Sequence, residues 1–256
     1  MLATNPPSVH PSQYDALGSH YTSVFKSLPS SAIETTNLHA AIVPHILGAH
    51  VLDLDYSTGY YSRKLLEWGA ASVVGVDLSA EMVAVANSQI PVGVGRERLR
   101  FVVRDALTLG RISLSNSNSN SNSDSDSGGV GAGQFTLITG AWVLNYAASL
   151  SEMTAMFTTI AANLCPTSDV FAGIVPPAVA RADLDALAHE TNKLNKRSDR
   201  TAMMGFARNY YERLESGDGW RTETMAGREG EGDGRVAFRN YHLAREVYEE
   251  GARRGG

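Results

Sequence analysis

The chain has 256 residues, and its 22 lysines and arginines stand against 27 aspartates and glutamates, which gives a formal net charge of −5. An apolar fraction of 43% at this length suits one α/β domain over residues 1–256, and the acidic balance argues against a nucleic-acid partner. The single cysteine, Cys165, excludes an internal disulfide and a cysteine-based zinc site. The opening segment is polar and no apolar run approaches the ~20 residues of a membrane helix, so we expect a cytoplasmic protein with no membrane partner.

The first predicted helix begins at Ser31, and Pro44 should end or kink it near Val43, because proline disfavours helical backbone at the preceding residue. A short apolar run at residues 51–54 predicts the first strand, which lacks the alternation of a half-exposed strand. Residues 59–68 place tyrosine, leucine and tryptophan side chains on roughly one face, which predicts a second helix.

A valine-rich run at residues 72–76 predicts the second strand, and Ser79 is a suitable N-cap for a helix that runs to about Gln89. A third strand is expected at residues 99–103. The following segment, residues 113–133, consists almost wholly of serine, asparagine, aspartate and glycine, so it offers almost nothing to a core. We interpret it as a disordered low-complexity loop insertion.

A fourth strand is predicted at residues 135–139, and the clearest helix of the chain follows over residues 149–164. Ser149 and Glu152 form a capping box at its start, and its methionines are interpreted as core packing. Residues 170–175 predict a fifth strand, closed by two prolines.

The C-terminal part predicts two short strands, at residues 220–224 and 236–240, and a helix over residues 243–252. The alternation of strands and helices along the chain predicts an α/β fold with a doubly wound, mainly parallel sheet. Ligands of such sheets bind at the carboxyl ends of the strands, near the point where the strand order reverses. The residues that directly follow each strand are therefore the candidates for a functional site.

The residues after the first two strands belong to a block, VLDLDYSTGYYSRKLLEWGAASVVGVDLSAEMVAVA, at residues 51–86. This block resembles motifs I and II of the class I S-adenosylmethionine (SAM) methyltransferases, and more narrowly of small fungal members related to secondary metabolism. The segments YDALGSHY and GAWVLNYA resemble the same group. The resemblance implies the Rossmann-like class I methyltransferase fold, S-adenosyl-L-methionine as cofactor and a small-molecule acceptor.

Two carboxylates at strand ends are the central candidates for cofactor binding. Asp77 follows the second strand, where a carboxylate can accept both ribose hydroxyls, and it lies 18 residues after Gly59, near the ~20 residues expected in dinucleotide sites. Its alternative role is a helix cap before Ser79. Asp53 at the end of the first strand either contacts the cofactor or satisfies loop amides.

The resemblance implies further cofactor contacts. A pair of N-terminal tyrosines resembles a lid over the cofactor, two apolar residues would flank the adenine, and the residues after the third strand would meet its amino group. The lid tyrosines are Tyr14 and Tyr21, and the residues that flank the adenine are Leu78 and Met82. The residues near its amino group are Asp105 and Ala106, and Ala141 is a further contact after the fourth strand.

The first motif departs from the family pattern, acidic–x–Gly–x–Gly–x–Gly, because Asp55, Ser57 and Gly59 occupy its three glycine positions. Ser57 is a mild change, since its side chain is small. Asp55 would place a second carboxylate beside that of the cofactor, and two like charges about 4 Å apart repel by ~1 kcal/mol in water and ~4 kcal/mol at an effective dielectric of about 20. Pairing of Asp55 with the ammonium or the sulfonium would offset part of this cost, so the sign of the net effect stays open.

Two further departures concern the sheet. Thr136 stands where the family usually has Phe–Asp before the fourth strand. The helix at residues 243–252 leaves no segment for the antiparallel strand that normally completes the family's sheet, so we expect this strand to be missing unless one of the two C-terminal strands takes its place. A truncated gene model is the alternative explanation.

Three aromatic side chains are candidates for the acceptor side of the site. Trp142 and Tyr146 follow the fourth strand and could form an apolar or cation-attracting wall near the sulfonium, or could simply pack between sheet and helix. His242 is the candidate general base, since an imidazole titrates near neutral pH; its alternative is a cap or a surface residue. The histidine spacing gives no pair of metal ligands on a helix face, so no metal is expected.

The leading interpretation is SAM-dependent methyl transfer to a small molecule by in-line displacement at the methyl carbon. The alternative is a methyltransferase fold that no longer transfers methyl groups, either a binding or scaffold protein or a cyclisation catalyst that retains SAM; Asp55 and Thr136 favour it. A nicotinamide oxidoreductase is a weaker candidate, because the Gly–x–Gly–x–x–Gly pattern is missing. The residues do not indicate an oligomeric state.

Overall fold

The computed structural model describes residues 13, 24, 28–54, 57–114, 133–166, 170–197, 205–227 and 236–256. The expectations for Tyr14, Tyr21 and Asp55, and for most of the predicted loop insertion, lie outside these residues.

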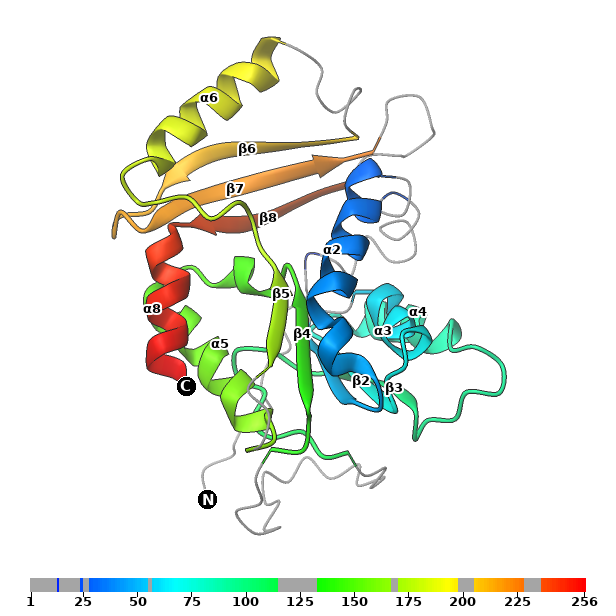
Figure 1. The fold of residues 1–256 in the computed structure, drawn as a ribbon. Helices are drawn as coiled ribbons and strands as arrows, with labels where there is room; N and C mark the ends of the chain where they lie inside the picture. Colours follow the sequence, from blue (N-terminus) through cyan, green and yellow to red (C-terminus); the bar gives the residue numbers. More distant parts are fainter. Residues whose placement is uncertain are drawn as a thin grey trace, which may run out of the picture.

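Five parallel strands form the main sheet, in the order β3-β2-β1-β4-β5 (Figure 1). The strands are β1 (His50–Leu54), β2 (Ser72–Asp77), β3 (Leu99–Val103), β4 (Leu137–Ala141) and β5 (Phe171–Ile174). The strand order reverses between β1 and β4, which places the switch point of the sheet beside the end of β1. The predicted doubly wound, mainly parallel α/β sheet is confirmed.

Helices cover both faces of this sheet (Figure 1). One face packs against α2 (Pro29–Ile46), α3 (Tyr60–Glu67) and α4 (Ala80–Ser88), and the other against α5 (Leu150–Asn163) and α8 (Arg245–Gly255).

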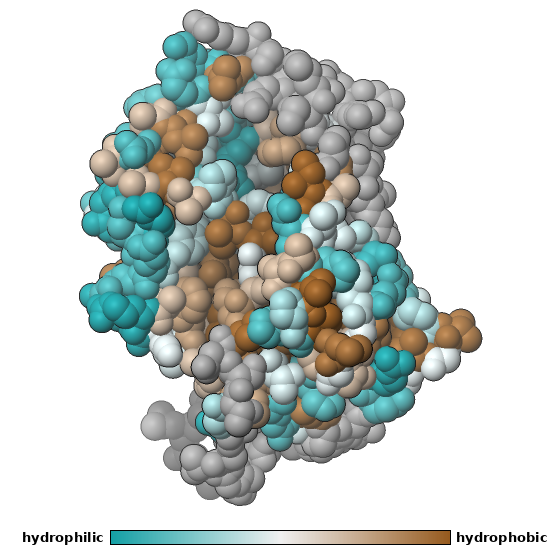
Figure 2. Space-filling model, in the orientation of Figure 1, coloured by the Kyte–Doolittle hydropathy of each residue, from teal (hydrophilic) through white to brown (hydrophobic). Residues whose placement is uncertain are grey.

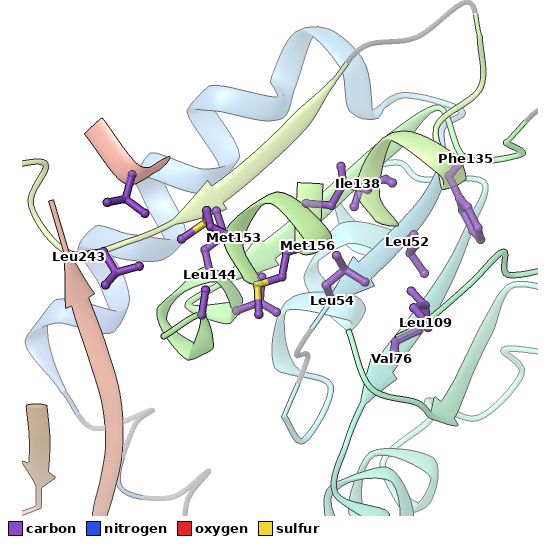
Figure 3. Packing of buried hydrophobic residues seen from close by; sticks show 14 of the residues in the cluster. Leu52, Leu54, Val76, Leu109, Phe135, Ile138, Leu144, Met153, Met156 and Leu243 are labelled. Carbon is purple, nitrogen blue, oxygen red and sulfur yellow. The ribbon is translucent and has the colours of Figure 1, made fainter. Parts of the chain in front are cut away.

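Successive strand side chains belong to opposite cores, because side chains alternate between the two faces of a strand. In β1, Val51 packs with the α2–α4 side and Leu52 with the α5 side. This is why the strand runs are apolar at consecutive positions. Met153 and Met156 of α5 point into the second core beside Leu144, which confirms the interpretation of these methionines as core packing (Figure 3).

A second, antiparallel sheet consists of β6 (Phe206–Arg213), β7 (Gly219–Ala226) and β8 (Val236–Leu243). It lies beyond the carboxyl ends of β4 and β5, with α6 (Leu184–Arg197) on its outer face (Figure 1). The two predicted C-terminal strands are confirmed within β7 and β8, whereas β6 and α6 were not predicted. The second sheet therefore stands over the edge at which the sequence places a functional site.

Several predicted boundaries are wrong. The last helix begins at Arg245 and ends at Gly255, whereas it was predicted over residues 243–252. α2 continues through Pro44 to Ile46, where both Ile42 and Ile46 are buried in the core. The fourth strand begins at Leu137, two residues later than predicted, and Phe135 instead forms an isolated bridge with Leu164.

Within the described part of the chain, the main sheet ends at β5 and contains no antiparallel strand, as the sequence led us to expect. The residues of β5 are only partly covered, and Figure 2 shows apolar side chains in a hollow over this region of the molecule. Among the described residues, no helix is both long enough and apolar enough to cross a bilayer.

Candidate functional site

The turn from β1 into α3 uses left-handed backbone at two positions. Ser57 has φ 55° and Gly59 has φ 76°. A Cβ atom on Gly59 would lie 2.7 Å from Cζ of Phe101, so this position has room only for glycine. Ser57 adopts a conformation that L-residues avoid at a cost of ~1–2 kcal/mol, which explains why the related motif has glycine there. The described end of the strand-to-helix turn, residues 57–59, therefore keeps left-handed backbone at both positions despite the serine.

The carboxylate of Asp77 joins this turn to the end of β2. Its Oδ2 accepts a hydrogen bond from the backbone N–H of Ser57 at 2.9 Å, and its Oδ1 accepts one from the N–H of Ser79 at 2.8 Å. The second bond is the local capping contact that the sequence offered as an alternative. The first shows that the same carboxylate also holds Ser57 of the β1 loop. Asp77 is 5% exposed, so a ribose hydroxyl would share a carboxylate whose two oxygens already accept backbone N–H groups.

The two residues expected to flank an adenine differ sharply in exposure. Leu78 directly follows Asp77 and is 46% exposed, although it is a large apolar side chain. Met82 is 1% exposed, and its sulfur accepts a hydrogen bond from the hydroxyl of Ser57 at 3.8 Å. Leu78 thus offers apolar surface to a ligand, whereas Met82 lies beneath the turn and offers none in this conformation.

Asp53 is 1% exposed, and both of its carboxylate oxygens are engaged by side chains. The hydroxyl of Ser62 in α3 donates to Oδ2 at 2.5 Å, and the hydroxyl of Thr139 in β4 donates to Oδ1 at 2.8 Å. Burial raises the pKa of Asp53 to about 6, although these two hydrogen bonds oppose the shift. Asp53 therefore links β1, α3 and β4 through side-chain hydroxyls, and not through the loop amides that the sequence offered as its structural role.

The residues after β3 and at the end of β4 lie at the same edge of the sheet. Val103, the last residue of β3, pairs with Asp77, and the half-buried Asp105 and Ala106 follow it. The carboxylate of Asp105 accepts a hydrogen bond from the N–H of Leu107 at 2.9 Å, which shapes the local turn. Ala141 closes β4 on the other side of β1.

Trp142 directly follows β4 with a left-handed φ of 73°. Its indole N–H donates to the carboxylate of Glu34 in α2 at 3.2 Å, and the guanidinium carbon of Arg208 in β6 lies 5.8 Å from its ring centroid. Burial raises the pKa of Glu34, and the bond from Trp142 partly opposes this. Tyr146, in the short 3-10 helix η1 (Val143–Tyr146), is half-buried against the α5 core.

Glu34 and Arg208 were not predicted as site residues. Glu34 lies in the first turns of α2, and its approach to Trp142 depends on how α2 packs on the sheet. Arg208 lies in a strand that was not predicted. No local sequence signal could have identified either residue.

His242 is placed where a general base could not act. It lies inside β8 and is 1% exposed. Its Nε2 lies 3.1 Å from the carbonyl oxygen of Pro177, which can only accept, so Nδ1 accepts from the hydroxyl of Tyr210 at 2.7 Å. Burial lowers the pKa of His242 to about 4. Both ring nitrogens are therefore occupied within the fold, and this correction gives His242 a structural role in place of the expected catalytic one.

Metal binding has no support in the described ranges, which contain no group of three or more histidine, cysteine, aspartate or glutamate side chains that could hold an ion.

Comparisons with known proteins agree with this geometry. Residues 51–117 match the family model described as a methyltransferase domain, a segment that spans β1 to β3 and the turn with Ser57 and Gly59. No curated protein matches the chain.

Three solved structures resemble the whole fold. The PH0226 protein from Pyrococcus horikoshii is 17% identical with a TM-score of 0.55, over 95% of this chain and 90% of that one. The sugar N-methyltransferase KedS8 from Streptoalloteichus is 17% identical with a TM-score of 0.53, over 100% of this chain and 90% of that one. DesVI from Streptomyces venezuelae is 14% identical with a TM-score of 0.53, over 94% and 89%. The chain therefore has the Rossmann-like fold of the class I methyltransferases, with a small antiparallel sheet in addition.

Proposed function

We propose that this protein is a SAM-dependent methyltransferase that acts on a small-molecule acceptor. The observation that carries the proposal is the Asp77 carboxylate, held by the turn at Ser57, beside the exposed side chain of Leu78 at the carboxyl ends of β1 and β2. The match of residues 51–117 to the methyltransferase domain model supports it.

The residues present fit the nucleoside part of SAM. Asp77 would accept the ribose hydroxyls and Leu78 would cover one face of the adenine, while Asp105 and Ala106 would meet its amino group. The left-handed turn at residues 57–59 brings backbone close to the switch point, where the methionine part would lie. When bound, SAM supplies a methyl group already activated by its sulfonium.

The acceptor side would be formed by Trp142 and Tyr146, which follow β4 at the same edge. Positioning of the acceptor in line with the methyl group would supply much of the rate, because alignment alone removes a large entropic part of the barrier. His242 has no part in this scheme. The tyrosines Tyr14 and Tyr21 remain proposed as a lid.

By the resemblance of its motifs, we extend the proposal to an acceptor from secondary metabolism. The amino-acid composition is the basis on which we also propose a cytoplasmic location.

The test is calorimetric titration with S-adenosylhomocysteine, the demethylated product. Wild type should bind, and Leu78→Asp should bind at least about tenfold more weakly, because it puts a charge on the adenine face. Leu47→Asp is the matched control: Leu47 is 87% exposed at the end of α2, and its replacement should leave binding unchanged. Absence of heat with wild type, or equal effects of the two variants, would contradict the proposal.

The same titration decides the sign that the sequence leaves open for Asp55. We propose that Asp55→Gly binds S-adenosylhomocysteine more tightly than wild type, because S-adenosylhomocysteine lacks the sulfonium charge that could offset the repulsion between the two carboxylates. Transfer of labelled methyl from SAM to an acceptor panel then separates an enzyme from a protein that only binds. Tight binding without transfer to any acceptor would favour the scaffold or cyclisation alternative.

A further inference from the structure

Arg208 is carried to the candidate site by the second sheet. It lies in β6, is half-buried, and places its guanidinium over the ring of Trp142, 5.8 Å from the centroid. Trp142 is the first residue after β4, at the edge where the methyl acceptor would lie. The two sheets thus converge on this edge through an arginine and a tryptophan.

The charge of Arg208 is not balanced by a carboxylate within the described residues. Three other arginines of the second sheet form ion pairs: Arg213 with Asp185, Arg221 with Glu212 and Arg239 with Glu223.

No such ion pair involves Arg208 in the described ranges. Its guanidinium interacts with the hydroxyl of Tyr210 through a side-chain hydrogen bond, and its charge also acts on His242 and Tyr248; all three partners are uncharged at neutral pH. Glu34 binds the ring edge of Trp142 through the indole N–H, whereas Arg208 lies over the ring face. A half-buried guanidinium that no carboxylate of the described residues neutralises is able to bind an anion from outside the fold.

Asn145 provides a second, independent observation at this edge. It lies in η1, three residues after Trp142, and is fully buried. Neither the oxygen nor the nitrogen of its side-chain amide has a hydrogen-bond partner within the described residues. Buried amides in native proteins are nearly always satisfied, so an unpaired one beside a candidate site indicates that a polar ligand atom or a water completes it.

We propose that the methyl acceptor carries an anionic group, a carboxylate or a phosphate, that Arg208 binds beside Trp142. This inference rests on the proposed methyltransferase function and adds the class of acceptor. The planar fork of a guanidinium matches both anions with two parallel hydrogen bonds, and the cation–π contact with Trp142 keeps the guanidinium at this edge.

The test uses benzoate, phenyl phosphate and the neutral benzamide as probes, titrated calorimetrically into protein with and without saturating S-adenosylhomocysteine. Wild type should bind at least one anion about tenfold more tightly than benzamide. Which anion binds better distinguishes a carboxylate acceptor from a phosphate acceptor. Arg208→Gln, and Arg208→Met, which keeps a long side chain over Trp142, should each lose this preference.

The matched control is Arg239→Gln, because Arg239 also lies over an aromatic ring, 5.9 Å from that of Tyr211, on the same sheet. It should bind the anions as wild type does. Anions that bind no better than benzamide, or a preference that survives in a folded Arg208 variant, would overturn the inference. Since S-adenosylhomocysteine binding is measured first, a protein that binds it but ignores the anions contradicts only this inference, whereas one that never binds it contradicts the proposed function.

Discussion

At the scale of single residues, burial raises the pKa of one acid, Asp53, and lowers the pKa of one base, His242. The contributions of these two residues to stability therefore change with pH in opposite directions. Asp53 has a folded pKa of about 6, above the ~3.9 of an unfolded aspartate. Between these values the folded state binds more protons than the unfolded state, so the stability from this group is complete below the unfolded pKa of ~3.9 and is lost as the pH rises through about 6. The shift of about two units corresponds to ~3 kcal/mol.

Asp53→Asn should therefore gain stability relative to wild type as the pH rises through this range, because an amide cannot ionise. Urea unfolding of both proteins between pH 4 and 7 measures the difference. A difference that stays constant with pH would show that the ionisation of Asp53 is not penalised in the fold.

His242 gives the opposite dependence, because its folded pKa of about 4 lies below the ~6.5 of an unfolded histidine. The unfolded state binds more protons between these values, so the contribution of His242 is complete above pH 6.5 and is lost as the pH falls towards 4.

His242→Gln should abolish this loss of ~3 kcal/mol, while His45→Gln, at an exposed position in α2, should keep it. The measurement is the free energy of unfolding of wild type and of both variants at pH 4.5 and at pH 7. An equal change between the two pH values in all three proteins would contradict a buried, neutral imidazole at position 242.

At Gly59, before α3, left-handed backbone coincides with close packing. Gly48, before β1, has the same backbone conformation without the close packing, so a comparison of the two glycines separates the effects. Gly48 and Gly59 both have left-handed φ, but a Cβ atom on Gly48 meets nothing within 4 Å, whereas one on Gly59 meets Phe101 at 2.7 Å. Gly48→Ala should cost ~1 kcal/mol from strain alone, and Gly59→Ala should cost an additional ~1–3 kcal/mol from overpacking. Denaturant unfolding compares the two variants, and equal costs would mean that the ring of Phe101 moves away freely.

At the scale of elements, the start of α5 is fixed by its cap. The hydroxyl of Ser149 accepts from the N–H of Glu152 at 3.2 Å, and the carboxylate of Glu152 accepts from the N–H of Ala148 at 2.6 Å, one residue before the partner of a standard capping box. Ser149→Ala should destabilise the protein by ~1 kcal/mol. Thr158→Ala, exposed in the interior of the same helix, should be close to neutral in thermal unfolding, and equal losses would argue against the cap.

The elements that the sequence predicted well are those with a local signal. The five parallel strands are apolar at consecutive positions, and Ser79 and Ser149 mark two helix starts by their capping chemistry. α2 runs past Pro44 because burial of Ile46 extends the helix, which a local rule does not include. β6 is largely polar, and its extended backbone depends on pairing with β7 and on side-chain amides of α6, such as Asn192, that bind its backbone.

At the scale of the whole molecule, the part of the site that could be predicted is the part built from consecutive strand ends. Asp77 and Leu78 follow directly from the position of β2, since the carboxyl ends of parallel strands share one edge. The acceptor side depends on long-range placement: Glu34 comes from the first described helix and Arg208 from a separate sheet. Whereas Glu34 and Arg208 were missed, His242 was wrongly included, because its residue type suits a general base but its burial excludes that role.

The ribose contact of Asp77 is tested most directly by a double-mutant cycle across the binding site. S-adenosylhomocysteine and its 2′-deoxyribose analogue are titrated into wild type and into Asp77→Asn. Loss of the 2′-hydroxyl should weaken binding to wild type by about tenfold and should weaken binding to the variant less, because a neutral amide oxygen accepts the hydrogen bond of the hydroxyl more weakly than a carboxylate does. An equal loss in both proteins, or no binding of S-adenosylhomocysteine to wild type, would contradict a nucleoside held by Asp77 at the end of β2.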